Sequence, residues 1–339
     1  MDPMIRTRPT PQKPGAPLSA PKAREKSGLP PIIVRLAAPR GFCAGVERAI
    51  RTVEEALAHY GPPVYVRHEI VHNTHVVARL SAMGAIFVDS LTEAPTHRPI
   101  IFSAHGAPQS THNQAALRQM IKIDATCPLV LKVHAQARRF LAAGYQIVLI
   151  GHKNHPEVIG TLGQAPKGAI HLLENLNQAR AFTPGNLPLA YATQTTLSVD
   201  DTRDIIALLK QRFPDIVGPA KDDICYATSN RQSAVKAGAP GTDLFVVIGS
   251  QTSSNSLRLV ETAHAAGAKH ALLTEDASQF DWSHIDNVHS LGLSAGASVP
   301  ERLVEDFLTA LASRRSLKIE TITTASENMV FNTPLQLAS

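Results

Sequence analysis

Short apolar segments alternate with segments of helical period along most of the chain. After the apolar run 32–36, Val46, Ile50, Val53 and Leu57 fall on one face of a helix that ends at Gly61. Further strands are predicted at 64–66, 86–88, 100–102, 146–150, 169–173, 187–193, 243–249, 270–273 and 288–293. Further helices are predicted at about 73–83, 128–142, 200–213, 228–237, 255–266 and 300–312. This alternation is typical of α/β proteins, in which helices cover parallel, buried sheets.

Three turns place a cysteine between an apolar run and a helical segment. They are PRGFCAGVERAI around Cys43, KIDATCPLVLKVH around Cys127 and DDICYATSNRQSAV around Cys225, and these are the only cysteines of the sequence. At the start of a helix, unpaired amide groups and the helix dipole favour the thiolate over the thiol. We therefore expect three thiolates, each at the end of a strand.

The spacing of the cysteines predicts three similar α/β units, each of which donates one thiol to a shared centre. The expected units are 31–124, 125–222 and 223–320, with a C-terminal tail at 321–339. In open α/β sheets, ligands bind beyond the carboxyl ends of the strands, where all three cysteines are expected. The predicted fold is therefore α/β, with mostly parallel sheets arranged pseudo-threefold around a central site.

Composition and charge change this picture mainly at the N-terminus. The formal net charge is +5, but residues 1–30 combine a basic composition with seven prolines. We interpret this segment as a disordered basic tail, and it lacks the Ser richness of a plastid transit peptide. The remainder is nearly neutral, has no apolar run of about 18 residues and shows no disulfide pattern. These features predict a cytoplasmic, bacterial-type protein that binds neither a membrane nor nucleic acid.

Loops at the predicted strand ends carry polar groups that suit a phosphate. They contain His72, His105, His152, His155, Glu157, Thr193, Thr195, Thr196, Ser253, Ser254, Asn255, Ser294 and Ser298. Neutral donors at turns that enter helices can hold a phosphate group, and an anion raises the pKa of a nearby imidazole. Neither a P-loop nor a GxGxxG motif follows a predicted strand. Singly these residues have ordinary roles, such as a serine cap on a helix, but together they predict a site for a small phosphorylated substrate.

Three converging thiolates fit two kinds of metal centre. Zinc would need a fourth ligand, for which histidine is the natural choice. An iron–sulfur cluster is usually held by four cysteines. With three cysteines, a [4Fe–4S] cluster would leave one iron without a protein thiolate, and that iron could bind a substrate oxygen as a Lewis acid. The spacing of the residues does not choose between zinc and a cluster.

Several blocks of the sequence resemble the signature segments of one enzyme family. In chain order they are PRGFCAGVERAI, VRHEIVHN, FSAHGAP, DATCPLV, GHKNHPEV, TQTTLS, KDDICYATSNRQ, SSNS and AGAS, within about residues 33–315. Together they are similar to the 4-hydroxy-3-methylbut-2-enyl diphosphate reductase family, which acts last in the methylerythritol phosphate route to isoprenoids. ENMVFNTP at 327–334 resembles the family's tail segment more weakly. One departure is Ala38, where the family commonly has Asn.

The resemblance implies an oxidoreductase with one [4Fe–4S] cluster at the centre of the three units. It implies Cys43, Cys127 and Cys225 as the cluster ligands, with one iron open to substrate. Glu157 matches the family's proton donor, and Thr195 matches a hydroxyl relay beside it. The implied substrate-binding residues are His72, His105, His155, Thr195, Ser253, Ser254, Asn255 and Ser298.

The implied reaction is a two-electron reductive dehydration of (E)-4-hydroxy-3-methylbut-2-enyl diphosphate to isopentenyl diphosphate and dimethylallyl diphosphate. The chain has no recognisable flavin or nicotinamide site, so the electrons must come from outside, and a ferredoxin or flavodoxin is the family's usual donor. Two alternatives use the same residues. One is a zinc-dependent hydrolase of a small phosphorylated substrate, and the other is a cluster-based sensor without enzymatic activity.

Overall fold

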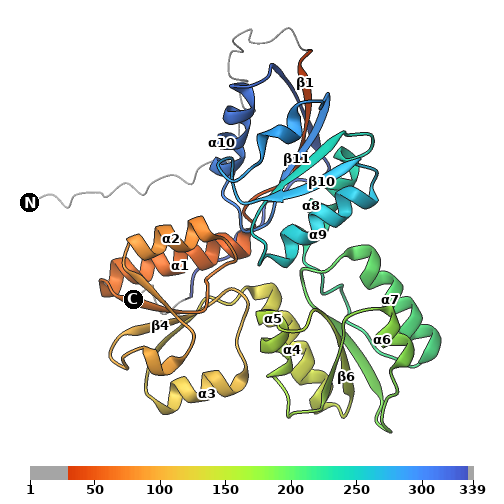
Figure 1. Cartoon of the computed structure of the whole chain (residues 1–339). Helices are drawn as coiled ribbons and strands as arrows, with labels where there is room; N and C mark the ends of the chain where they lie inside the picture. Colours follow the sequence, from red (N-terminus) through yellow and green to blue (C-terminus); the bar gives the residue numbers. More distant parts are fainter. Residues whose placement is uncertain (1–29, 335–339) are drawn as a thin grey trace, which may run out of the picture.

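A computed structural model of the chain describes residues 30–334. Three lobes surround a common centre, and each lobe contains one parallel β-sheet with helices packed against it (Figure 1). The α/β prediction and the prediction of three units are thereby confirmed. The predicted disordered tail at 1–30 lies almost wholly outside the described residues.

The upper lobe in Figure 1 contains a five-stranded sheet in the order β10-β9-β11-β1-β12. Its strands are β1 (Ile32–Ala38), β9 (Leu244–Ile248), β10 (His270–Thr274), β11 (Ser290–Ala295) and β12 (Leu317–Thr323). Its helices are α8 (Tyr226–Gly238), α9 (Ser254–Ala265), η2 (Trp282–Ile285) and α10 (Glu301–Ala312). Side chains alternate along β9: Val246 packs with Phe307 of α10, whereas Phe245 packs with Val235 of α8. Both faces of the sheet are therefore buried at β9, whereas the edge strand β12 has no buried residue.

The lower left lobe in Figure 1 contains a four-stranded sheet in the order β3-β2-β4-β5. Its strands are β2 (Val64–Arg67), β3 (Ala85–Val88), β4 (Pro99–Phe102) and β5 (Ile121–Asp124). The helices of this lobe are α1 (Ala44–Tyr60), α2 (Thr74–Ala82), η1 (Leu91–Glu93) and α3 (Gln109–Leu117). The predicted apolar face of α1 packs on the sheet, with Val53 among Val66 and Ile101.

The lower right lobe in Figure 1 contains a three-stranded sheet in the order β7-β6-β8. Its strands are β6 (Gln146–Ile150), β7 (Ile170–Leu173) and β8 (Leu189–Thr193). Its helices are α4 (Pro128–Ala142), α5 (Pro156–Leu162), α6 (Leu176–Ala181) and α7 (Val199–Arg212). Every residue of β6 and of β8 is buried, as expected for strands covered on both faces.

The chain passes from one lobe to the next at each cysteine, which precedes the first helix of the new lobe. Cys43 follows β1 of the upper sheet and precedes α1, which packs on the lower left sheet. Cys127 follows β5 of that sheet and precedes α4, which packs on the lower right sheet. Cys225 follows the lower right sheet and precedes α8, which packs on β1 of the upper sheet. The three lobes are thus joined in a closed cycle with the cysteines at the crossings.

The strand pairing differs from the expected units at two places. Residues 31–38 were expected in the first unit, but β1 pairs with β11 and β12 of the upper sheet. The boundary expected at 320 falls inside β12, which extends to Thr323. Parallel pairing joins segments that are far apart in the chain, so local patterns do not reveal it. In the described part of the chain, the helices are too short or too polar to cross a membrane.

Candidate functional site

The backbone N–H of each cysteine donates a hydrogen bond to one of the loops that carry the predicted substrate-binding residues. The Cys43 N–H donates to the Ala297 carbonyl (3.2 Å), beside Ser298. The Cys127 N–H donates to the carbonyl of the residue before His105 (3.0 Å), and the Cys225 N–H donates to that of Thr195 (3.1 Å). The three cysteines and the predicted substrate loops therefore meet in one region, at the carboxyl ends of the strands.

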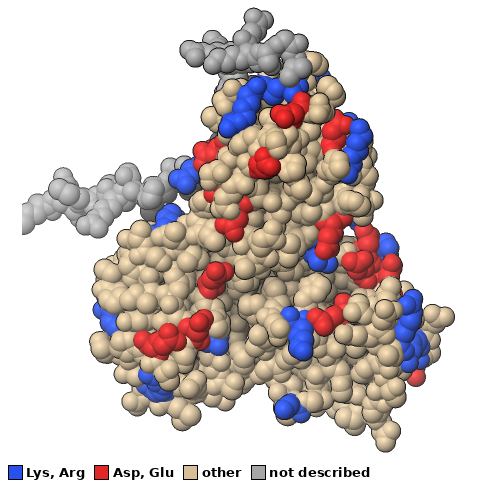
Figure 2. All heavy atoms as spheres, in the orientation of Figure 1, with Lys and Arg blue, Asp and Glu red and all other residues tan. Residues whose placement is uncertain are grey.

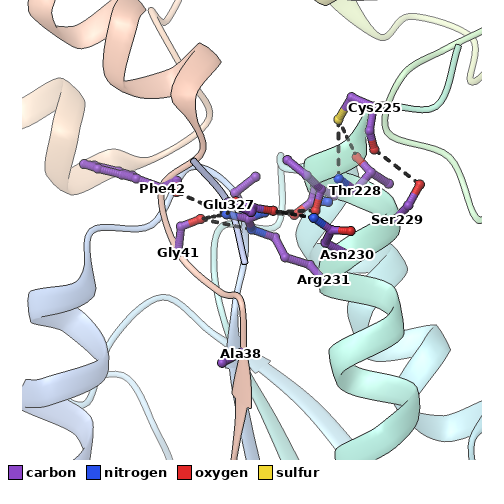
Figure 3. Close-up of polar contacts among 12 residues, drawn as sticks. Ala38, Gly41, Phe42, Cys225, Thr228, Ser229, Asn230, Arg231 and Glu327 are labelled. Carbon is purple, nitrogen blue, oxygen red and sulfur yellow. Dashed lines mark hydrogen bonds and ion pairs between the residues drawn. The ribbon is translucent and has the colours of Figure 1, made fainter. Parts of the chain in front are cut away.

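Two of the cysteine sulfurs lie close to Gly45, in the first turn of α1. A Cβ atom at this position would lie 2.6 Å from the Cys127 Sγ and 3.9 Å from the Cys43 Sγ. The third sulfur, of Cys225, accepts a hydrogen bond from the Thr228 N–H (3.4 Å) and lies 3.1 Å from the Thr228 Oγ1 (Figure 3). Glycine at position 45 keeps the space between the thiols clear.

The protonation of two of these thiols differs from the sequence prediction. Burial raises the pKa of Cys127 to about 12 and that of Cys225 to about 11, and the nearby charge of Cys43 adds to both shifts. The amide groups at the helix starts lower both values, as predicted, but by less than burial raises them. The prediction that the helix start alone yields thiolates is therefore wrong for these two. A positively charged group bound between the sulfurs would reverse the balance.

Three imidazoles from the predicted set lie together. The rings of His72 and His105 stack with their centroids 4.1 Å apart, and the His155 ring lies 5.7 Å from the first and 6.0 Å from the second. Burial and the neighbouring imidazoles lower the pKa of His105 well below its usual value and that of His155 to about 3. The rings of His105 and His155 are consequently neutral at pH 7, and a bound anion would raise the pKa values of both.

A cavity of about 360 Å³ opens beside these rings. Its wall includes His72 and His105 from the lower left lobe, Asn154 from the lower right lobe and Thr252 from the upper lobe. A ligand in this cavity would contact all three lobes.

Glu157 is a buried carboxylic acid at the start of α5. Its Oε1 accepts a hydrogen bond from the Thr195 N–H (2.7 Å), and its Oε2 accepts one from the Thr195 Oγ1 (2.9 Å). His155 caps the same helix, with its Nδ1 accepting from the Glu157 N–H (3.2 Å). Burial raises the pKa of Glu157 to about 7, although the two bonds from Thr195 act in the opposite direction. A carboxyl group with this pKa can both hold and release a proton near neutral pH.

The predicted serine and asparagine residues surround the same region, with different partners. Ser253 caps α9 by accepting from the Ser256 N–H (3.3 Å), so it has the ordinary role that the sequence also allowed. The Asn255 Oδ1 accepts from the Ala297 N–H (2.8 Å), and the Ser298 Oγ donates to the His72 carbonyl (2.8 Å). The Asn255 bond lies within the upper lobe, whereas the Ser298 bond joins the upper lobe to the lower left lobe.

Two nitrogen atoms of this region, Nε2 of His72 and Nδ2 of Asn255, are buried and have no hydrogen-bond partner among residues 30–334. Buried polar atoms are normally paired. Both atoms can donate a hydrogen bond to an oxygen. For His72 this requires the tautomer in which Nε2 carries the proton. An oxyanion ligand would satisfy them.

Gln194 is a residue that the sequence reasoning missed. It is buried; its Oε1 accepts from the His152 N–H (2.9 Å) and its Nε2 donates to the Thr196 Oγ1 (2.7 Å). The Thr196 hydroxyl in turn donates to the Ser254 Oγ (3.1 Å). Gln194 lies inside the TQTTLS block, which was the available signal, but its type suggested no role.

The donor set of the centre fits an iron–sulfur cluster. Among residues 30–334, no three Cys, His, Asp or Glu side chains lie close enough together to share a single metal ion. The three cysteines instead approach the same region from three helix starts. In a cluster each cysteine binds its own iron, so its ligands stand further apart than those of a single ion.

Comparisons with known proteins agree with this geometry. The family model described as LytB protein matches residues 34–312. A 4-hydroxy-3-methylbut-2-enyl diphosphate reductase of Hyphomonas neptunium is 58% identical over 310 residues, covering 91% of this chain and 98% of the relative. One from Phenylobacterium zucineum is 54% identical with the same coverage.

A solved structure is also similar. The E-1-hydroxy-2-methyl-but-2-enyl-4-diphosphate reductase of Plasmodium falciparum superposes with a TM-score of 0.87 at 39% identity, over 91% of this chain and 98% of that one. The family expected from the sequence blocks is thus confirmed, and the chain belongs to the LytB protein family of 4-hydroxy-3-methylbut-2-enyl diphosphate reductases.

Proposed function

We propose that this chain reduces (E)-4-hydroxy-3-methylbut-2-enyl diphosphate to isopentenyl diphosphate and dimethylallyl diphosphate. Two electrons and two protons enter, the allylic C–O bond breaks, the hydroxyl oxygen leaves as water, and one new C–H bond forms. The observation that carries the proposal is the meeting of three thiols, three imidazoles and one buried acid in a region bordered by all three lobes. The names of relatives that share more than half of their residues with this chain support it.

The enzyme uses an iron–sulfur cluster, for which Cys43, Cys127 and Cys225 are the ligands in our proposal. When bound, the cluster supplies the electrons and a Lewis-acidic iron. Gly45 leaves room between two of the sulfurs, where any side chain would intrude. Burial favours the protonated thiols of Cys127 and Cys225 by raising their pKa values, so cluster binding releases protons from these two residues.

The diphosphate lies among His72, His105 and His155, with Asn255 and Ser298 beside them. The free nitrogens of His72 and Asn255 donate to its oxygens. The negative charge of the diphosphate raises the pKa values of the imidazoles, so that binding is coupled to proton uptake. In this proposal Ser254 contributes its hydroxyl, whereas Ser253 shapes the turn as the cap of α9.

Glu157 donates the proton that converts the leaving hydroxyl into water. Its hydroxyl-bearing neighbour Thr195 accepts the proton from the carboxyl group on one side and passes its own proton to the substrate oxygen on the other. Burial keeps the pKa of Glu157 near 7, so the carboxyl group carries a proton in a large share of molecules at neutral pH. The second proton goes to either end of the allylic carbon chain, which explains two products.

The electrons come from a separate redox protein, and we propose a ferredoxin or a flavodoxin for this role. On the face shown in Figure 2, Lys and Arg are interspersed with Asp and Glu. The charge pattern of this face therefore singles out no docking surface.

An anaerobic reductase assay tests the proposed function. Purified protein is supplied with the allylic diphosphate and a chemical electron donor, and iron, sulfide and zinc are measured on the same sample. We expect isopentenyl and dimethylallyl diphosphate, together with iron and sulfide. Zinc without iron or sulfide, and hydrolysis of a phosphate ester, would instead favour a hydrolase, for which the comparisons offer no support. Iron and sulfide without turnover would favour a sensor.

A further inference from the structure

Three basic side chains lie near the starts of the helices that the cysteines begin, five residues after Cys43 and Cys127 and six residues after Cys225. Arg48 lies on α1 behind Cys43, Lys132 lies on α4 behind Cys127, and Arg231 lies on α8 behind Cys225. Each is about one and a half helical turns from its cysteine. The sequence motifs predict no role for Arg48, Lys132 or Arg231.

Arg48 holds the loop that precedes the next cysteine, Cys127. Its Nη1 donates to the Thr126 carbonyl (3.0 Å), and its Nη2 donates to the Asp124 carbonyl (3.4 Å). The guanidinium is buried, and two of its nitrogens are used on this loop. Arg48 therefore fixes the backbone that leads directly into Cys127.

Lys132 holds the loop that precedes Cys225 in the same way. Its Nζ donates to the carbonyls of Lys221 and Asp222, both at 3.0 Å. It also forms an ion pair with the buried Asp223 (3.4 Å), two positions before the cysteine. With 39% of its side chain exposed, Lys132 is the most accessible of the three cations.

Arg231 holds the loop that precedes Cys43 and so closes the cycle. Its Nε and Nη2 donate to the Gly41 carbonyl (3.0 and 2.6 Å), and Nη2 also donates to the Phe42 carbonyl (3.1 Å). The side chain is fully buried and pairs with Glu327, at 3.0 Å (Figure 3). These partners converge on one guanidinium from two parts of the chain, 41–42 and 327, that are distant in sequence.

We propose that Arg48, Lys132 and Arg231 form a closed ring of positioning residues around the three thiols. Each cation stands on the helix of one cysteine and holds the loop of the next, so the three sulfurs are placed relative to one another. The ring also places three positive charges on the helices that carry the three thiols, where they can offset the negative charge of the thiolates once the cluster is bound. This inference rests on the proposed cluster.

The C-terminal segment 324–334 completes two of the three links. The Asn332 carbonyl accepts from the Arg48 Nε (2.7 Å), and the Glu327 carboxylate pairs with Arg231. No such contact is made by Lys132, whose hydrogen bonds within residues 30–334 go only to the loop before Cys225. Of the three cations, Lys132 is therefore the least surrounded by other parts of the chain. Removing its charge should disturb the packing less than removing that of Arg48 or Arg231.

The test is the rate at which iron leaves the loaded protein in the presence of an excess of chelator under anaerobic conditions. Groups that orient metal ligands typically contribute about 10–100-fold to metal affinity. We expect Arg48→Gln and Arg231→Gln to lose iron at least about tenfold faster than the wild type, and Lys132→Gln to do so by a smaller factor. We also expect the cluster of Lys132→Gln to become harder to reduce, with a more negative potential, because a positive charge near it is gone. Lys132→Arg should restore both values.

Arg51→Gln is the matched control. Arg51 also lies on α1 and also binds the C-terminal segment, at the Phe331 carbonyl (2.6 Å), but its hydrogen bonds reach no cysteine loop. It should lose iron at the wild-type rate. If Arg48→Gln or Arg231→Gln does not fold, as judged by circular dichroism, Lys132→Gln decides the outcome.

Two results would overturn the proposal. One is a Lys132→Gln variant that matches the wild type in both iron loss and potential. The other concerns thermal stability, measured for each variant relative to the wild type with and without bound iron. An equal loss of stability in the iron-free and iron-bound proteins would mark a purely structural role. Failure of the wild type itself to bind iron would instead contradict the proposed function, so the two failures are distinguishable.

Discussion

Replacing Glu157 with Gln removes the proposed proton donor and keeps its size. The carboxyl group accepts two bonds from Thr195 and has a pKa of about 7. A general acid in such a position typically contributes about 10²–10⁴ in rate. We therefore expect turnover of Glu157→Gln to fall by about this factor, while iron content and substrate affinity stay near the wild-type values.

The same substitution should make the fold more stable at alkaline pH. Burial raises the pKa of Glu157 from 4.5 to about 7, so the folded protein holds this proton more tightly than the unfolded chain does. Below pH 4.5 the group is neutral in both states and costs nothing. As the pH rises through 7 the buried carboxylate must form, at a cost of about 3 kcal/mol. Gln carries no charge, so the stability of the variant relative to the wild type should increase from pH 5 to pH 8.

Turnover is measured anaerobically with a chemical electron donor, and stability is measured by urea denaturation of the loaded protein at pH 5 and pH 8. Wild-type turnover should decline above about pH 7 as Glu157 loses its proton. A variant within about threefold of wild-type turnover would remove Glu157 from the mechanism, because that factor is far below the contribution of a general acid. A stability difference independent of pH would show that the raised pKa is wrong.

Three further predictions concern the neighbours of this acid and the thiols. Thr195→Val removes the proposed relay hydroxyl and should lower turnover; it also removes a hydrogen bond that lowers the pKa of Glu157, so the alkaline decline of the remaining turnover should move to higher pH, with Thr195→Ser close to the wild type. Gly45→Ala places a methyl group 2.6 Å from a cysteine Sγ and should sharply reduce iron content, whereas Gly238→Ala meets its nearest side chain at 3.8 Å and should not. Cys43→Ser should bleach the brown colour of the protein, and normal iron content in that variant would contradict the assignment of its thiol as a ligand.

Much of the secondary structure could be predicted because its signals are local. The helix 128–142 and the strand 146–150 have the predicted bounds, since Pro128 starts one and Gly144 separates the two. The helices α3 and α6 were missed because their residues are mostly polar and show no apolar stripe. The pairing of β1 with β12 could not be predicted from the sequence, because it depends on contacts between residues near opposite ends of the chain.

The site could be predicted by residue type but not by its electrostatics. His72, His105 and His155 do lie together, as the loop pattern indicated. The raised pKa values of Cys127 and Cys225 were not foreseen, because desolvation depends on packing around the sulfurs and leaves no mark in the motif. Ala38 offers only a methyl group where the family commonly has Asn, and its carbonyl accepts from the Thr324 N–H (3.0 Å). The backbone bond to the C-terminal segment thus does not depend on the missing amide.

The passage of the chain from one lobe to the next at each cysteine has a consequence for how the protein could be divided. Each sheet is covered by helices of its own lobe, so an excised lobe would keep the partners of buried side chains such as Val66, Ile147 or Phe245. Each cysteine, however, lies at a junction between two lobes, so a single lobe would carry too few thiols to rebuild the centre. The hydrophobic packing of this architecture is divisible, whereas its chemistry needs all three parts together.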